Sequence, residues 1–200
     1  MTTRTETLAG QQLRDMFDAA SSWLEKSSSD IDALNVFPVP DGDTGTNMML
    51  TMRSTIEEAF RAPDHSATGV AGAMARGALM GARGNSGVIL SQIWRGMARG
   101  LEGKDNFTAA DLATALQQAS DVAYSGVSNP VEGTMLTVIR DAAAAAQQKV
   151  DDGVTDVIEV LEATVEAAGE SVANTPTLLK VLKDAGVVDA GGQGVYTILE

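Results

Sequence analysis

The sequence contains no cysteine, and this excludes disulfides and thiolate metal sites. It has a single histidine, His65, so catalysis by histidine has no support. Aromatic residues make up only 4% of the 200 residues, while long stretches are rich in Ala, Leu, Met and Glu. Because that mixture favours helices over sheets, we expect an all-α protein.

Positive charge is also scarce, since 14 Lys and Arg residues stand against 27 Asp and Glu residues and the net charge is −13. A chain of this charge repels phosphate backbones at long range, so we expect no nucleic-acid partner. A nucleotide can still bind where a metal ion, helix N-termini or a few placed cations change the local charge. We therefore expect a metal ion at any nucleotide site.

Long apolar runs are missing as well. Even residues 87–101 are interrupted by Gln92 and Arg95, and no run approaches the roughly 18 apolar residues of a membrane span. The first seven residues are polar and lack the apolar core of a signal peptide. We expect no transmembrane segment and a cytoplasmic location. The length fits one compact domain with its own core.

Apolar residues at spacings of three and four predict eight or nine helices, separated by breaks that contain Gly, Pro or Asn. Thr108 and Asp111 have the spacing of a helix N-terminal cap, and Thr175–Pro176 is typical of a helix start. Residues 36–39 form the longest credible strand. The expected helices cover residues 10–26, 48–60, 69–80, 86–101, 109–122, 134–148, 154–172 and 176–185.

A glycine-rich loop at residues 189–194 leads into an apolar pattern that stops at residue 200 without a terminating signal. We therefore expect residues 1–200 to be a single domain from the N-terminal part of a longer chain.

The most informative loop carries Asp41, Gly42 and Asp43. Two carboxylates one residue apart repel each other unless a cation compensates them, and no Lys or Arg lies within nine residues on either side. Oxygen ligands of this kind suit Mg²⁺, which typically takes one or two carboxylates and completes its shell with water and phosphate. The alternative is that both residues only cap the next helix. An EF-hand is excluded, because Thr46 and Met52 occupy its glycine and glutamate positions.

Further loops could contribute to the same site. Thr44, Thr46 and Asn47 follow the aspartates at a helix start, where backbone N–H groups and hydroxyls suit phosphate. Residues 81–87 form a second glycine-containing loop at a helix start, where Asn85, Ser86 and Gly87 could bind phosphate in the same way. A tight turn between helices is an equal alternative. Two further loops are weaker candidates. One contains Thr134 and Met135, and the other contains Asp189, Gly191 and Gly192.

Four segments resemble the A subunit of bacterial fatty acid kinases, a family whose first domain is similar to the L subunit of dihydroxyacetone kinase. Their sequences are LNVFPVPDGDTGTNM at 34–48, GARGNSGVILSQ at 81–92, EGTML at 132–136 and VVDAGGQG at 187–194. The first is long and specific, and the four occur in the family's order across essentially the whole chain. The resemblance therefore joins the four loops into one site.

The resemblance implies a closed barrel of about eight antiparallel helices, with ATP or ADP and two Mg²⁺ ions held by loops at one end. It implies Asp41 and Asp43 as metal ligands, with Asn35 at the place of a third, acidic ligand in the dihydroxyacetone kinases. It also implies an acceptor, a fatty acid carboxylate presented by a separate lipid-binding B subunit. A homodimer, if one forms, would use regions beyond residue 200.

A carboxylate acceptor is already ionised at neutral pH, so no general base is expected and catalysis consists of positioning and charge neutralisation. Arg83 is the candidate cation for the transferring phosphoryl group, with a plain surface role as the alternative. Residues 37–40, which contain two prolines, are our candidate docking element for the lipid carrier, with packing beneath the loop as the alternative. Two other functions stay open: phosphotransfer to a small ketone, and nucleotide binding without turnover.

Overall fold

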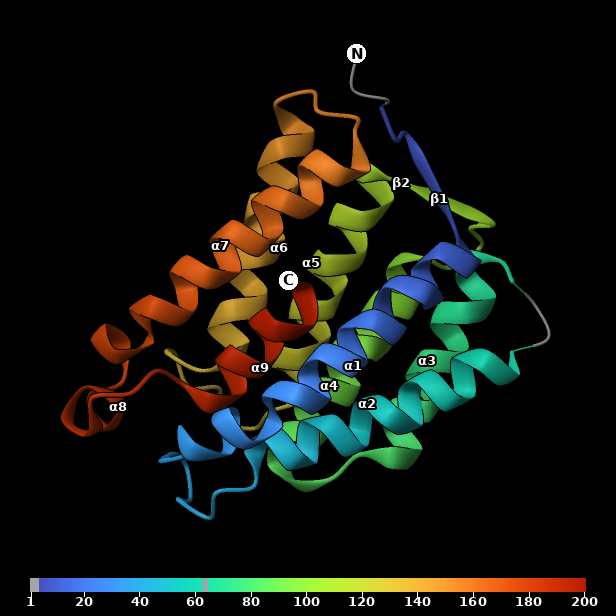
Figure 1. Cartoon of the computed structure of the whole chain (residues 1–200). Helices are drawn as coiled ribbons and strands as arrows, with labels where there is room; N and C mark the ends of the chain where they lie inside the picture. The colour runs from blue at the N-terminus through green and yellow to red at the C-terminus, as the bar shows by residue number, and fades with distance from the viewer. Residues whose placement is uncertain (1–3, 63–64) are drawn as a thin grey trace.

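The computed structural model describes residues 4–62 and 65–200, and in these residues the chain forms nine helices and one two-stranded ribbon (Figure 1). The strands are β1 (Thr7–Ala9) and β2 (Asn106–Thr108), which pair antiparallel. The helices are α1 (Gly10–Ala33), α2 (Thr44–Arg61), α3 (Ala67–Gly81), α4 (Gly84–Gly100), α5 (Ala109–Ser125), α6 (Met135–Asp151), α7 (Val157–Leu178), α8 (Lys180–Ala185) and α9 (Ala190–Leu199).

Eight of these helices form a closed ring, and α8 lies outside it. Each helix from α1 to α7 packs against the next one in the sequence, while α9 packs against both α7 and α1 and thereby closes the barrel. Successive helices run in opposite directions, so α2, α4, α6 and α9 all begin at the end opposite the β1–β2 ribbon (Figure 1). The predicted all-α barrel of about eight antiparallel helices is confirmed.

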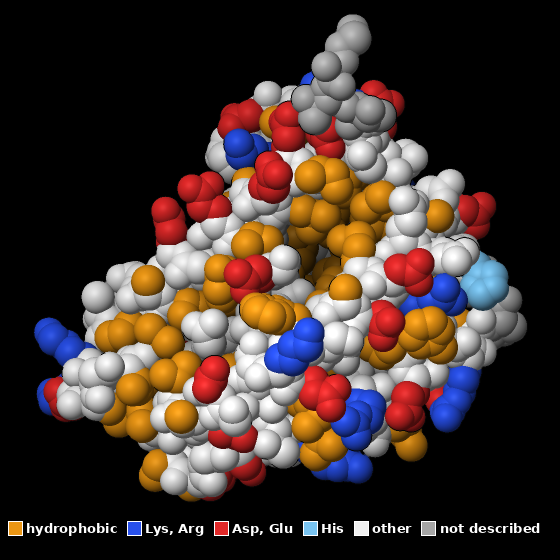
Figure 2. Space-filling view, in the orientation of Figure 1, with side chains coloured by type: hydrophobic (Ala, Val, Ile, Leu, Met, Phe, Trp, Pro, Cys, Tyr) orange, Lys and Arg blue, Asp and Glu red, His pale blue; other side chains and the backbone are white. Residues whose placement is uncertain are grey.

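Small residues allow the helices of the barrel to approach closely. A Cβ atom on Gly96 or Gly100 of α4 would overlap the backbone of α5 at Ala119 or Ala115. Larger apolar side chains, such as those of Met48 and Leu90, are fully enclosed between the helices. Figure 2 shows one face, on which acidic side chains are dispersed and apolar side chains surround a central hollow. Close contact and burial of this kind stabilise helices that are individually marginal in water.

Two of the local signals are confirmed. The hydroxyl of Thr108 accepts a hydrogen bond from the backbone N–H of Asp111, and the Asp111 carboxylate accepts one from the N–H of Thr108. This reciprocal pair starts α5 as the spacing predicts. Gly186 ends α8 in the left-handed conformation with φ of 71°, which glycine adopts without a steric penalty.

The prediction that the first helix ends near residue 26 is wrong. The helix continues to Ala33, although residues 27–30 are polar. Ile31 is 1% exposed and packs in the core, and the close fit of Gly45 against the backbone of Ser28 holds this last part of α1 against α2. Tertiary contact therefore outweighs the weak helix preference of the serines.

The prediction of a new helix at Thr175–Pro176 is also wrong, because Pro176 lies inside α7. A proline cannot donate to the carbonyl four residues earlier, here that of Val172. The hydroxyl of Thr175 donates to that same carbonyl at 2.7 Å, so the acceptor is satisfied and α7 continues to Leu178.

Two further expectations are corrected in the described residues. Residues 36–39 form no strand, and the glycines of the expected loop at 189–194 lie in the first turns of α9. The packing there is close, since Cβ atoms on Gly192 and Gly194 would press against the side chains of Val138 in α6 and Met48 in α2. None of the helices in residues 4–62 and 65–200 is long and apolar enough to cross a membrane.

Candidate functional site

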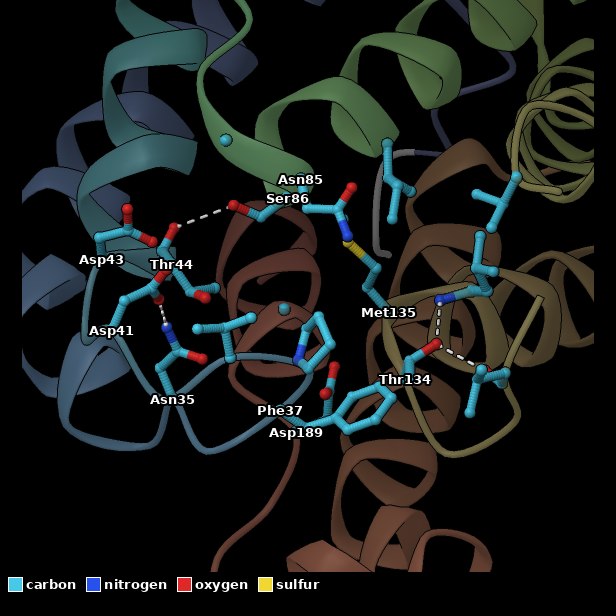
Figure 3. Close-up of a pocket in the computed structure, with 18 of the residues that line it drawn as sticks. Asn35, Phe37, Asp41, Asp43, Thr44, Asn85, Ser86, Thr134, Met135 and Asp189 are labelled. Carbon is cyan, nitrogen blue, oxygen red and sulfur yellow. Dashed lines mark hydrogen bonds between the residues drawn. The ribbon is translucent and has the colours of Figure 1, made fainter. Parts of the chain in front are cut away.

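A cavity of about 420 Å³ opens at the end of the barrel where α2, α4, α6 and α9 begin (Figure 3). This volume lies in the range of small-molecule sites. Its walls come from the four loops that the sequence singles out and from the first turns of these helices. The lining residues are Asn35, Phe37, Pro38, Val39, Asp41, Asp43, Thr44, Gly84, Asn85, Ser86, Ile89, Val127, Asn129, Val131, Thr134, Met135, Leu136, Asp189 and Gly191.

Oxygen atoms gather at one end of this cavity. Asp41 and Asp43 are exposed there, and the side-chain amide of Asn35 donates to Asp41 Oδ1 at 2.8 Å (Figure 3). Asn35 is only 7% exposed, and among the described residues nothing donates a hydrogen bond to its Oδ1. A buried carbonyl oxygen without a partner is costly unless a ligand or water satisfies it. Two carboxylates and this oxygen match the hard ligands that Mg²⁺ prefers.

The aspartate loop is held in place by Asp32, near the C-terminal end of α1. Its carboxylate accepts from the backbone N–H of Thr46 at 3.0 Å and from the Thr46 hydroxyl at 2.7 Å. This links the end of α1 directly to the first turn of α2, so the ten residues between them form a closed loop with Asp41 and Asp43 near its end. The contact fixes where the two carboxylates enter the cavity.

The α3–α4 turn reaches the same end of the cavity. Gly84 begins α4 with φ of 57°, and a Cβ atom there would overlap the side chain of Asn47. Glycine is therefore needed for its conformation and for this contact. The Ser86 hydroxyl lies 3.5 Å from the carbonyl oxygen of Thr44, at the outer limit of a hydrogen bond. The N-terminus of α4 thus lies beside that of α2 (Figure 3).

The opposite end of the cavity is mainly apolar. Phe37 and Met135 contribute side chains to its wall, and the peptide bond between Phe37 and Pro38 is cis. Figure 3 shows Phe37 on the same side of the cavity as Asp189 and Thr134, away from Asp41 and Asp43. The cavity is therefore divided into a polar end and an apolar end.

Asp189 joins two of the helices that begin at the apolar end. Its carboxylate accepts from the backbone N–H groups of Gly192 in α9 and Met135 in α6, and its own N–H donates to Thr175 at 3.0 Å. Burial raises the pKa of this carboxyl to about 6, although the two N–H groups act in the opposite direction. Asp189 is thus a structural cap whose charged form is disfavoured.

This raised pKa predicts a pH dependence of stability. Between the unfolded value of 3.8 and about 6, the folded state keeps the Asp189 proton and the unfolded state releases it. The contribution of Asp189 is therefore full below pH 3.8 and decreases as the pH rises through 6, by about 3 kcal/mol in total. The variant Asp189→Asn lacks this titration, so it should gain stability relative to wild type from pH 4 to pH 7.

Urea unfolding of both proteins at several pH values measures this difference directly. The other carboxyl groups are common to both chains and cancel in the comparison. A wild-type minus variant difference that stays constant from pH 4 to pH 7 would show that the Asp189 pKa is not raised.

The structure places most of the candidate residues on the cavity wall, but five of them lie outside its lining. Thr46 is bound to Asp32, and Asn47 packs beside Gly84. The Arg83 guanidinium donates to the carbonyl oxygens of Ala82 and Gly81, at 3.0 and 3.4 Å. Gly87 packs against Thr51, and the N–H of Gly192 is bound to Asp189. In this structure these five residues therefore do not line the cavity, although each lies close in the sequence to a residue that does.

Sequence reasoning missed several members of the site. Asp32 is one, since no pattern shows that it will contact Thr46 at a distance of 14 residues. Ile89 and Leu136 could have been found, because they lie inside the motif segments 81–92 and 132–136. Val127 lies outside the candidate loop at residues 129–135 and carries no motif, so nothing in the sequence places it in the wall.

The chain belongs to the DAK2 domain family, which matches residues 38–200. It is similar to the protein YloV of Bacillus subtilis, with 47% identity over 97% of this chain and 35% of YloV. The protein SH1689 of Staphylococcus haemolyticus is 46% identical over 96% of this chain and 34% of its own length. The chain therefore spans about a third of the length of these relatives.

The fold is also similar to a solved structure, the native form of the dihydroxyacetone kinase of C. freundii. The TM-score is 0.65 over the whole of this chain and 35% of that one, with 17% sequence identity. This likeness supports the barrel architecture, and the sequence resemblance to the L-subunit type of domain is confirmed at the level of the family.

Proposed function

We propose that this chain is a kinase domain that binds Mg·ATP in the cavity of Figure 3, with the phosphates at the polar end and the base at the apolar end. The observation that carries the proposal is the convergence of four helix N-termini on one cavity that also holds two carboxylates and the unpartnered oxygen of Asn35. Helix N-termini attract phosphate, and carboxylates attract the metal that accompanies it.

The capping of these helices supports this orientation of the nucleotide. The N-cap residues of α2 and α4 make no side-chain cap, and in α2 the N–H of Thr46 is bound by Asp32, whereas Thr134 caps α6 and Asp189 caps α9. Uncapped N–H groups are free to bind anions. Phosphate oxygens would therefore be bound by Thr44, Asn85 and Ser86, and the base and sugar would lie against Met135, Thr134 and Gly191.

Asp41 and Asp43, together with Asn35, are the residues that would hold Mg²⁺. The fit rests on the chemistry of this donor set and on the buried Asn35 oxygen that lacks a partner. When bound, such an ion neutralises charge on the phosphate oxygens. Two ions are part of the same proposal. Within the described residues no group of three Asp, Glu, His or Cys side chains could hold a metal ion, so the proposed set combines two carboxylates with the Asn35 oxygen.

The proposed acceptor is a fatty acid carboxylate, and the product is an acyl phosphate. In this reaction a carboxylate oxygen of the acid attacks the γ-phosphorus of ATP, the bond to the bridging oxygen breaks, and ADP leaves. The acid is already ionised, so the protein needs no base, and its residues bind and orient the two anions. Arg83 would assist only if its guanidinium left the carbonyls of Gly81 and Ala82.

A lipid-carrying partner is part of the proposal, because a free fatty acid would leave its chain in water. Burying roughly fifteen methylenes at about 0.8 kcal/mol each outweighs any contact to the carboxylate alone. Of the segment proposed to dock the carrier, Phe37, Pro38 and Val39 all line the cavity, and Val39 is 58% exposed. We therefore propose Val39 as the residue of this segment that contacts a carrier.

The test compares formation of acyl phosphate from free oleate and from oleate bound to a carrier. It is run with this chain and with a full-length relative, since the chain spans about a third of the relatives' length. We expect turnover only with the carrier. Equal rates with free oleate would contradict the carrier requirement. Turnover of dihydroxyacetone instead would identify a small ketone as the acceptor, and nucleotide binding without any turnover would identify a scaffold.

A further inference from the structure

A polar cluster on the outside of the barrel holds the loop that forms one wall of the cavity. The α5–α6 loop, residues 126–134, contributes Val127, Asn129, Val131 and Thr134 to that wall. Its only acidic residue, Glu132, does not line the cavity and points instead to side chains of the flanking helices. The proposed function assigns no role to Glu132.

Three side chains donate to the Glu132 carboxylate. Arg140 of α6 does so at 2.7 Å, Thr137 of α6 at 2.9 Å, and the hydroxyl of Tyr124 of α5 at 2.9 Å. These donors lower the pKa of Glu132 against the raising effect of its partial burial, so the carboxylate is charged at neutral pH. One side chain of the loop is thus bound to both helices that flank it.

The cluster continues into the backbone next to the cavity. The Thr137 hydroxyl, which donates to Glu132, also accepts from the backbone N–H of Gly133 at 2.8 Å. Gly133 has φ of 82° and fits against the carbonyl of Thr175 and the side chains of Leu178 and Leu179. The next residue is Thr134, the cap of α6 and part of the wall. The carboxylate of Glu132 therefore fixes the backbone that immediately precedes the cavity.

We propose that Glu132 is a positioning residue, which holds the α5–α6 loop in the conformation that forms the base end of the nucleotide site. This inference rests on the proposed function for its ligand. Without the carboxylate the loop samples other conformations, and the apparent affinity falls with the fraction that remains competent. Because hydrogen bonds to a charged group are among the stronger ones, we expect the dissociation constant for Mg·ATP to rise about tenfold in Glu132→Ala.

Two further variants grade the effect. Glu132→Gln keeps an acceptor for Arg140 and Thr137 and should recover most of the affinity. Tyr124→Phe removes a single donor and should raise the dissociation constant by less than Glu132→Ala. Asp111→Asn is the control for loss of a paired carboxylate far from the site. Asp111 also joins an ion pair, with Lys104 at 2.7 Å, and a capping interaction, but it lies next to the β1–β2 ribbon, at the far end of the barrel.

The experiment measures nucleotide affinity by calorimetry and backbone amide exchange of the ligand-free chain. We expect Glu132→Ala to accelerate exchange in residues 126–134 without accelerating it in α1 to α4, and to bind Mg·ATP more weakly than Asp111→Asn. Unchanged exchange in this loop, or equal affinity losses in Glu132→Ala and Asp111→Asn, would overturn the positioning role. Amide exchange is measured without nucleotide, so it tests the role of Glu132 even if the wild-type chain does not bind ATP. Failure of the wild-type chain to bind ATP would overturn the proposed function instead.

Discussion

The variants Asp41→Ala and Asp43→Ala should each bind Mg·ATP about a hundredfold more weakly than wild type while keeping the helical fold. Both side chains are exposed in a loop, so their removal creates no cavity in the core. Each would remove one of the two charged ligands of the proposed metal. Isothermal titration with ATP at saturating Mg²⁺ measures the loss, and circular dichroism checks the fold.

Asp30→Ala is the control for charge. Asp30 is exposed near the end of α1 and does not line the cavity, so its removal changes the net charge by the same amount without touching the site. We expect wild-type affinity from this variant. Wild-type affinity in Asp41→Ala or Asp43→Ala would remove that residue from the proposed metal site. Equal losses of affinity in all three variants would show that the change in net charge, and not the loss of a metal ligand, weakens binding.

Gly45→Ala should destabilise the fold by about 3 kcal/mol, which corresponds to a fall in Tm of roughly 6–12 °C for a chain of this size. A Cβ atom at Gly45 would overlap the carbonyl oxygen of Ser28, and it would lie 3.0 Å from Cβ of Ile31. Both neighbours belong to α1, and Ser28 presents backbone that no rotamer change can move. Helices α1 and α2 must therefore separate, and the loop with Asp41 and Asp43 would move with them.

Gly72→Ala is the matched control in another helix of the barrel. The nearest atom to its added Cβ would be Nη1 of Arg76, at 3.6 Å, the far end of a flexible side chain. Alanine is the better helix former by about 1 kcal/mol, so this variant should be as stable as wild type or more so. Thermal unfolding followed by circular dichroism compares the two variants. A Tm for Gly45→Ala within error of that for Gly72→Ala would show that α1 and α2 adjust without cost.

The helices were predictable because periodicity and capping signals are local, whereas the closed barrel was expected from the family resemblance. The spacing of Thr108 and Asp111 correctly places the start of α5, and Gly186 correctly places the end of α8. The signals failed where distant contacts decide. Pro176 remains in a helix because Thr175 satisfies the carbonyl that the proline leaves open, and the glycines of α9 lie in a helix that packs closely against α2 and α6.

The sequence predicted most residues that line the candidate site, but not the residues that hold them in place. Asp41, Asp43, Ser86 and Met135 were found from their motifs, and the structure brings them to one cavity. Chemical type alone did not separate residues that face the cavity from those that do not. Thr46 has the side chain of a phosphate ligand, but Asp32 binds both its hydroxyl and its N–H group. Such pairings depend on the fold and leave no pattern in the sequence.

The most direct test of the proposed nucleotide site is a crystal structure of the chain with ADP and Mn²⁺, with the metal located by its anomalous scattering. Mn²⁺ prefers the same oxygen ligands as Mg²⁺. We expect an anomalous peak in direct contact with the carboxylates of Asp41 and Asp43 and with Oδ1 of Asn35. We also expect the phosphates at the N-termini of α2 and α4, and adenine beside Met135. A structure without a metal at these carboxylates, or with adenine beside Asn85, would contradict the proposed site.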